Sequence, residues 1–219
     1  ALKGQGDLPV PKEDALRVIE AMDRIWPEVK NRDLSFEPVI REKEAGEVEG
    51  RQTILVTGGA GRVGHYAIQW ASQAGATVIA SASSDKDKAT CVEAGAAHVV
   101  NHRDDDFADQ VLAATGGALV DRIVDVEFGA NLATSIVVLR IGGTIATYSS
   151  TQVTKPELPF LEMMYKDITL RFVIVYAMPE EAKEHAIADI NEALTANTLQ
   201  HRIAHALPLV EIEKKNELI

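Results

Sequence analysis

A short apolar run, residues 53–57, leads directly into a cluster of glycines, and a segment with helical apolar spacing follows. The cluster reads Gly59-Ala60-Gly61-Arg62-Val63-Gly64, which is the pattern G-x-G-x-x-G at a strand-to-helix turn. Glycines in such a turn let the backbone approach a pyrophosphate, and the free N–H groups that open the helix face its oxygens. The pattern predicts a dinucleotide site, and a glycine turn used only for packing is the alternative.

Strand-like and helix-like segments alternate along the chain after residue 51. Short apolar strands separated by helices are typical of a parallel sheet covered on both faces, so we expect a doubly wound α/β (Rossmann) fold. The expected strands are 53–57, 77–82, 97–101, 121–126, 143–148 and 168–175. The expected helices are 63–74, 85–94, 105–115, 131–140 and 180–196, and a loop with Pro156 and Pro159 precedes the sixth strand.

The two ends of the chain differ from this alternating region. Residues 1–49 are expected to form a helical segment, with one helix from about residue 12 to 26, and a charge-rich linker. Residues 50–197 form the expected Rossmann domain. The remainder, 198–219, contains a candidate strand at 201–206 and a short amphipathic helix from Val210.

Net charge, cysteine content and hydropathy exclude several classes of binding partner. A net charge of -11 argues against a nonspecific nucleic-acid surface. The single cysteine, Cys91, allows neither a disulfide framework nor a cysteine zinc site, which suits a cytoplasmic protein. No apolar run approaches the ~20 residues of a membrane helix, and the first residues do not read as a signal peptide. We therefore expect neither nucleic acid nor membrane as a partner.

The end of the second expected strand indicates which dinucleotide fits. NAD sites usually place a carboxylate there for the ribose 2′-OH, but residues 80–84 read Ala-Ser-Ala-Ser-Ser and the first carboxylate is Asp85. Small hydroxyls such as Ser83 leave room for a 2′-phosphate and can donate hydrogen bonds to it. This favours NADP over NAD. The alternative is that Ser83 and Ser84 only cap the next helix and that Asp85 reaches the ribose.

Positive charge for a 2′-phosphate is available nearby. Neighbouring parallel strands end side by side, so His102, which follows the third strand, is expected close to Ser83. The candidate basic residues are Lys86, Lys88, His102 and Arg103. An ordinary mixed-charge surface is the alternative for the two lysines, because they alternate with aspartates.

Four motifs together resemble a known family. They read VTGGAGRVG at 56–64, EAGAAHVVNHRDDDF at 93–107, VDRIVD at 120–125 and GGTIATYSS at 142–150. The run from about 50 to 218 resembles the cofactor domain of the medium-chain dehydrogenase/reductase superfamily, and is most similar to zinc-independent quinone oxidoreductases of the zeta-crystallin type. The resemblance implies an NADPH-dependent oxidoreductase that transfers a hydride from the nicotinamide to a quinone or another activated double bond. No side chain is then an obligatory catalytic base.

The resemblance also implies roles for individual positions. Ala60, Gly61, Arg62 and Val63 match the pyrophosphate turn, and Gly64 packs the helix against the strand. Ser83 matches a residue beside the 2′-phosphate, and His102 and Arg103 match the adenosine side. The positions expected near the rest of the cofactor are Asn131, Tyr148, Ser149 and Val173. As alternatives, Asn131 could serve only as a helix cap, Tyr148 as a wall residue and His102 as a surface residue.

Several readings of the whole chain stay open. The resembled family carries a long catalytic domain before the cofactor domain, and residues 1–49 do not resemble that catalytic domain. Residues 198–219 are interpreted as a strand and helix remnant of it. A non-catalytic nucleotide-binding or redox-sensing module and one piece of a split enzyme are therefore alternatives. A short-chain dehydrogenase is disfavoured because no tyrosine is followed four residues later by lysine. The scattered histidines and single cysteine suggest no metal ligand set, and a homodimer through the sheet edge is a further option.

Overall fold

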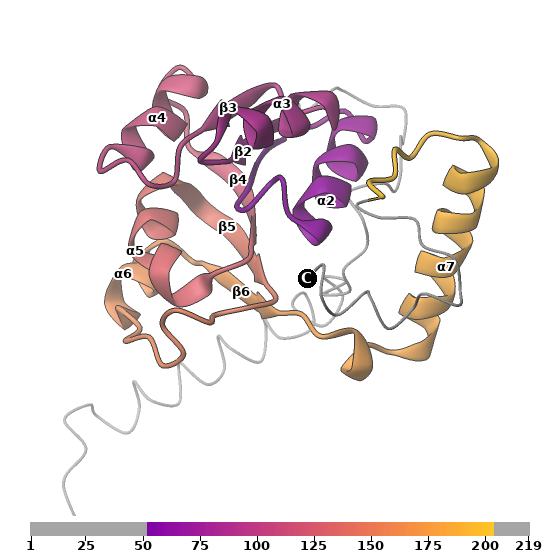
Figure 1. The fold of residues 1–219 in the computed structure, drawn as a ribbon. Helices are drawn as coiled ribbons and strands as arrows, with labels where there is room; N and C mark the ends of the chain where they lie inside the picture. Colours follow the sequence, from indigo (N-terminus) through magenta and orange to yellow (C-terminus); the bar gives the residue numbers. More distant parts are fainter. Residues whose placement is uncertain (1–51, 204–219) are drawn as a thin grey trace, which may run out of the picture. The chain divides into compact units, whose positions relative to one another are not determined.

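A six-stranded parallel sheet forms the centre of the structure (Figure 1). The computed structural model describes residues 52–203, which lie within one compact unit. The strand order is β3-β2-β1-β4-β5-β6, which is the Rossmann order and confirms the predicted fold class. The strands are β1 (Thr53–Val56), β2 (Thr77–Ser81), β3 (His98–Val100), β4 (Val120–Asp125), β5 (Leu139–Thr147) and β6 (Thr169–Phe172).

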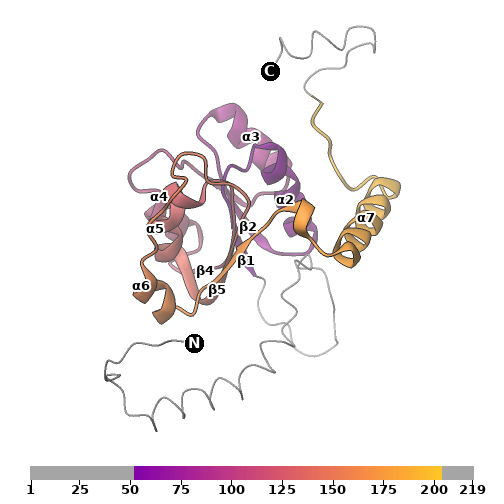
Figure 2. The same cartoon turned by 90° about the horizontal axis from the view of Figure 1, so that it is seen from below.

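Helices cover both faces of the sheet, because alternate strand residues face opposite sides. In β1, Ile54 and Val56 pack with Ile68 and Cys91 in one buried cluster, whereas Leu55 belongs to a second cluster on the other face. The first cluster involves α2 (Arg62–Gln73) and α3 (Asp85–Glu93), and the second involves α4 (Phe107–Ala114) and α5 (Phe128–Val138). Figure 2 shows these two helix pairs on opposite sides of the sheet.

The remaining elements follow the fifth strand. They are α6 (Phe160–Tyr165), a 3₁₀ turn (Val175–Ala177) and α7 (Glu180–Thr195), and α7 lies beyond α2 in both views (Figure 1, Figure 2). No helix in the described part of the chain is both long enough and apolar enough to cross a membrane.

The chain reverses its winding direction between β1 and β4. From β1 it moves outward to β2 and β3, then returns to the other side of β1 and continues through β4, β5 and β6. The carboxyl ends of all six strands share one edge of the sheet, and ligands of open α/β folds bind at that edge where the order reverses. The fold therefore places a candidate ligand site beyond the ends of β1 and β4.

Several predicted boundaries were wrong. The helix expected at 131–140 ends at Val138, and β5 begins at Leu139 instead of residue 143. Gly142, with a φ of 70°, lets the strand continue through an irregular register, so the two glycines did not end an element there. The expected sixth strand, 168–175, is only Thr169–Phe172.

Two further segments differ from expectation. The region taken as a proline-containing loop includes the short helix α6, which begins directly after Pro159 because proline is tolerated at a helix start. Residues 201–203 of the expected strand 201–206 have no regular structure. The expected helices near residues 12–26 and after Val210 lie outside the described residues.

Candidate functional site

The glycine-rich turn joins β1 to α2 and is pressed against β2. The Gly58 N–H donates to Ser81 Oγ at 3.0 Å, and the Gly59 N–H donates to the Ser81 carbonyl at 3.0 Å. Gly58 has a φ of 63°, and a Cβ on Gly59 would lie 2.9 Å from Cys91 Sγ. The turn therefore requires glycine at these two positions, and Ser81 fixes its place over the end of β2.

The amino end of α2 is open. Gly61 is the N-cap residue, and no acidic side chain lies in the first turn of the helix. Among residues 52–203, no protein acceptor faces the N–H groups of Arg62, Val63 or Gly64. Unpaired N–H groups at a helix start carry partial positive charge and suit a phosphate. The residues present thus fit the pyrophosphate of a dinucleotide.

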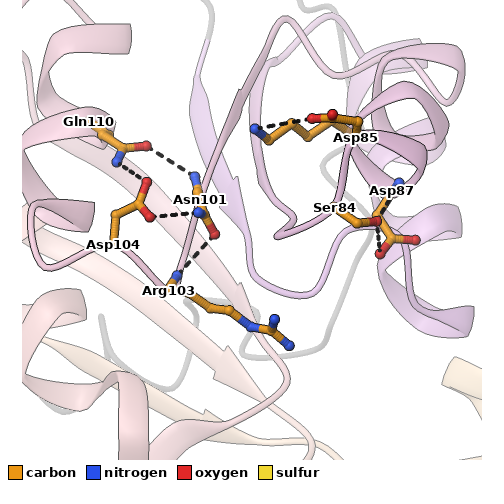
Figure 3. Close-up of polar contacts among 8 residues, drawn as sticks. Ser84, Asp85, Asp87, Asn101, Arg103, Asp104 and Gln110 are labelled. Carbon is orange, nitrogen blue, oxygen red and sulfur yellow. Dashed lines mark hydrogen bonds and ion pairs between the residues drawn. The ribbon is translucent and has the colours of Figure 1, made fainter.

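Two other helices that start at this edge of the sheet, α3 and α5, are closed by the protein itself. In α3 the Ser84 hydroxyl accepts a hydrogen bond from the Asp87 N–H at 3.1 Å (Figure 3). In α5 the Phe128 N–H donates to the Ser149 carbonyl and the Gly129 N–H to Ser150 Oγ, each at 2.9 Å. Helix α4 also lacks a side-chain cap, but it carries Asp109 in its first turn. Helix α2 has no acidic residue there, so its amino end leaves room for an external anion.

The positions expected on the adenosine side follow β2 and β3. The register pairs Ser81 with Val100, so Ser83 and His102 each stand two residues beyond paired positions. Ser84 caps α3, so the capping alternative holds for Ser84 and leaves Ser83 without that role. Lys88, in α3, forms an exposed ion pair with Asp85 at 3.8 Å, which is too weak to hold the lysine in place.

The loop after β3 is held by a small polar network (Figure 3). Asn101 donates to Asp104 Oδ1 at 2.6 Å and accepts from the Arg103 N–H at 3.1 Å, and Gln110 Oε1 accepts from the Asn101 N–H at 3.0 Å. The Arg103 side chain extends away from this network in Figure 3. His102 is exposed by surface area, yet partial desolvation and then the charge of Arg103 lower the pKa of its imidazole.

Two of the positions expected near the rest of the cofactor, Asn131 and Tyr148, contact the buried Asp125 at the end of β4. Asn131 lies inside α5 and donates to Asp125 Oδ1 at 2.7 Å, so it is not a helix cap. The Tyr148 N–H donates to the Asp125 carbonyl at 3.2 Å, and desolvation followed by the Asp125 charge raises the pKa of the tyrosine. The Val173 N–H donates to the Thr147 carbonyl at 2.8 Å, which places Val173 beside Tyr148, and Ser149 follows.

Sequence reasoning missed three charged side chains of the candidate site, two at the end of β4 and one at the glycine turn. Asp125 and Glu127 end β4 and begin α5, and their place at a strand end was the available signal. Arg202 donates from its guanidinium to the Ala60 carbonyl in the glycine turn. No local signal marks Arg202, because residues 198–203 reach the turn from far along the chain and are held on α2, for example by Gln200 N–H donating to Gln69 Oε1 at 2.7 Å.

Comparisons with known proteins identify the family. A family profile described as zinc-binding dehydrogenase matches residues 63–192, more than half of the chain. This chain belongs to the zinc-binding dehydrogenase family. The predicted resemblance to the medium-chain dehydrogenase/reductase superfamily is confirmed.

Curated relatives of this zinc-binding dehydrogenase family member include human quinone oxidoreductase, 23% identical over 172 residues that make up 78% of this chain and 52% of the relative. A 2-haloacrylate reductase from a Burkholderia species is 36% identical over 95 residues, 43% of this chain and 28% of the relative. The chain spans about half the length, or less, of these relatives.

Two solved structures share the fold. Mycobacterial Rv1454c complexed with NADPH superimposes with a TM-score of 0.67 at 24% identity, over 80% of this chain and 56% of that one. Escherichia coli quinone oxidoreductase complexed with NADPH gives a TM-score of 0.64 at 20% identity, over 74% of this chain and 51% of that one.

The described residues do not fit the zinc ion that the family description suggests. Within 52–203, no group of three or more His, Cys, Asp or Glu side chains is arranged to hold a metal. Cysteine binds zinc as a thiolate, but burial and then Asp87 raise the pKa of Cys91 to about 11, against a smaller opposing effect of Arg202. Cys91 is therefore a buried neutral thiol beneath the glycine turn.

Proposed function

We propose that this chain binds NADPH and belongs to an oxidoreductase of the quinone reductase type. The open amino end of α2, at the point where the strand order reverses, is the observation that carries the proposal. When bound, NADPH supplies a hydride, and the substrate is a quinone or another activated double bond. The names of the quinone oxidoreductase relatives, and of NADPH complexes with the same fold, support this assignment.

The described residues bind and orient the cofactor. Ala60, Gly61, Arg62 and Val63 hold the pyrophosphate, while Gly64 keeps α2 close to the turn. The adenosine 2′-phosphate lies near Ser83 and His102, with Lys88 and Arg103 as sources of positive charge. The proposed contacts on the nicotinamide side come from Asn131, Tyr148, Ser149 and Val173.

The finer assignments follow from the same reasoning. The proposed hydride transfer needs no zinc ion, because the cofactor itself carries the reducing chemistry. The proposed setting is the cytoplasm, with small molecules as partners and a homodimer as the assembly. Size-exclusion chromatography with light scattering measures the assembly directly.

The test is NADPH binding and oxidation by the purified chain with a panel of quinones and enones. We expect NADPH to bind, and Gly61→Val to abolish binding while the fold persists, because the new side chain would stand where the pyrophosphate approaches. Retained binding by Gly61→Val would contradict the site. Binding without turnover would favour the nucleotide-binding module or the split enzyme, since the chain spans about half of its quinone oxidoreductase relatives.

A further inference from the structure

Glu127 sits between β4 and α5 and turns away from the helix that it precedes. It occupies the N-cap position of α5 but makes no side-chain cap hydrogen bond. The residue is 7% exposed, so little of it contacts solvent. A buried carboxylate must be compensated by hydrogen bonds or opposite charge, and the loop that follows β5 provides the hydrogen bonds.

The carboxylate collects four donors from residues 151–153. Oε2 accepts from the Thr151 N–H at 2.8 Å and from the Thr151 hydroxyl at 2.7 Å. Oε1 accepts from the Gln152 N–H at 2.9 Å and the Val153 N–H at 3.4 Å. Successive backbone N–H groups that converge in this way form an anion site, and here the protein's own side chain fills it. Desolvation opposes ionisation, but the hydrogen bonds, led by those of Thr151, outweigh it and lower the pKa of Glu127.

The same loop closes the amino end of α5 in return. The Ser149 carbonyl and the Ser150 hydroxyl accept from the Phe128 and Gly129 N–H groups, and Ser150 Oγ donates to the Val153 carbonyl at 2.6 Å. A Cβ on Gly129 would lie 2.7 Å from Val153 Cβ, so loop and helix are in direct contact. Loop 149–153 and the start of α5 thus hold each other, and Glu127 supplies the only carboxylate described in this arrangement.

We propose that Glu127 is a positioning residue for the nicotinamide half of the cofactor. It fixes loop 149–153, and with it the orientation of Tyr148 and Ser149 at the end of β5. This inference rests on the proposed NADPH binding. The adenosine half lies on the other side of the reversal point, over β1, β2 and β3, and does not depend on this loop.

The first test measures by calorimetry how the substitution Glu127→Gln changes the affinity for two ligands. The variant keeps the side-chain size but removes the charge and places an amide N–H₂ against N–H donors. We expect NADPH to bind about tenfold more weakly, the size of effect that lost charge-assisted hydrogen bonds produce. The ligand 2′,5′-ADP, which contains only the adenosine half, should bind with unchanged affinity. The matched control is Glu157→Gln, which alters an exposed carboxylate in the segment between β5 and α6.

The second test measures amide hydrogen exchange in the absence of any ligand. In Glu127→Gln we expect the Thr151, Gln152 and Val153 amides to exchange at least about tenfold faster, with the amides of β1 and β4 unchanged. The inference would be overturned if Glu127→Gln bound NADPH with unchanged affinity, or if it bound NADPH and 2′,5′-ADP equally more weakly. Unchanged exchange of the loop amides would overturn it as well. If the unaltered chain binds neither ligand, the proposed function itself fails. The exchange experiment contains no ligand, so it tests the role of Glu127 in the loop separately.

Discussion

A single buried carboxylate joins the ends of three elements at the reversal point. Asp125 is fully buried and accepts from Thr57 Oγ1 at 2.8 Å, Asn131 Nδ2 at 2.7 Å and Thr147 Oγ1 at 3.4 Å. These donors follow β1, lie in α5 and end β5. The residue that holds Asn131, one of the predicted cofactor positions, in place is therefore an acid that the cofactor need not touch.

Removing this carboxylate should destabilise the fold. Asp125→Ala would leave buried donors without an acceptor, so we expect the free energy of unfolding to fall by about 3 kcal/mol. Urea denaturation followed by circular dichroism measures the change. The control is Asp105→Ala, which removes an exposed carboxylate and should cost less than about 0.5 kcal/mol. Equal losses for the two variants would contradict the role assigned to Asp125.

The only cysteine should be inert in the folded protein. Cys91 is completely buried, and burial raises its pKa to about 11, so the reactive thiolate is scarce at neutral pH. We expect alkylation at pH 8 to be at least about a hundredfold slower than in urea-unfolded chain. Mass spectrometry of timed samples measures both rates, and rapid labelling of folded protein would rule out the packed thiol beneath the turn. The same raised pKa makes stability depend on pH. Between pH 9 and about pH 11 the Cys91 thiol keeps its proton in the folded chain and loses it in the unfolded chain, so the free energy of unfolding should fall as the pH rises through that range.

At the scale of elements, the sequence predicted the order of strands and helices better than their limits. Apolar runs and 3.6-residue spacing depend on neighbours in the chain, so all six strands and five of the main helices were expected in the right order. The start of β5 was missed because its pairing with β4 shifts register at Val120 and Arg122, a property of two strands and not of one. The helix α6 was missed because two prolines mask a short helix that packs on the core through Met163.

The candidate site also has parts that the sequence could predict and parts that it could not. The glycine turn carries its own signal, because its backbone conformation limits which residues fit. Arg202 carries no such signal, and Glu127 carries only its place at a strand end. Their partners, Ala60 and residues 151–153, are brought near them only in the folded chain. Sequence reasoning could name positions at strand ends, but not which of them turn inward to hold loops.

Within the turn, two glycines should have separable roles. A Cβ on Gly64 would overlap the Gly58 carbonyl oxygen, whereas a Cβ on Gly61 would stay 3.0 Å from that oxygen. We expect Gly64→Ala to lower the free energy of unfolding by about 2 kcal/mol, because α2 must move away from the turn. Gly61→Ala should cost less than about 1 kcal/mol. Thermal or urea unfolding of both variants tests this, and an equal or reversed ranking would contradict the packing role of Gly64.

At the scale of the molecule, an acidic chain must bind a highly charged cofactor. The net charge is -11, so the phosphates of NADPH depend on local donors: the open end of α2 and the basic residues that follow β2 and β3. Such local attraction weakens with salt, since exposed charges are screened beyond about 10 Å at 0.1 M. The affinity for NADPH should therefore fall with ionic strength more steeply than the affinity for NADH, which lacks the 2′-phosphate.

The choice between the two cofactors tests the whole arrangement. No carboxylate follows β2 before the exposed Asp85, so NADPH should bind at least about tenfold more tightly than NADH at low salt. Ser83→Asp should reverse the preference, because its carboxylate would repel the 2′-phosphate and accept a hydrogen bond from the ribose 2′-OH. The control, Ser84→Asp, keeps a good N-cap for α3 and should retain the NADPH preference if Ser83 alone faces the ribose. Calorimetric titration of the three proteins with both cofactors measures this, and equal affinities in the unaltered chain would show that the end of β2 does not select the phosphate.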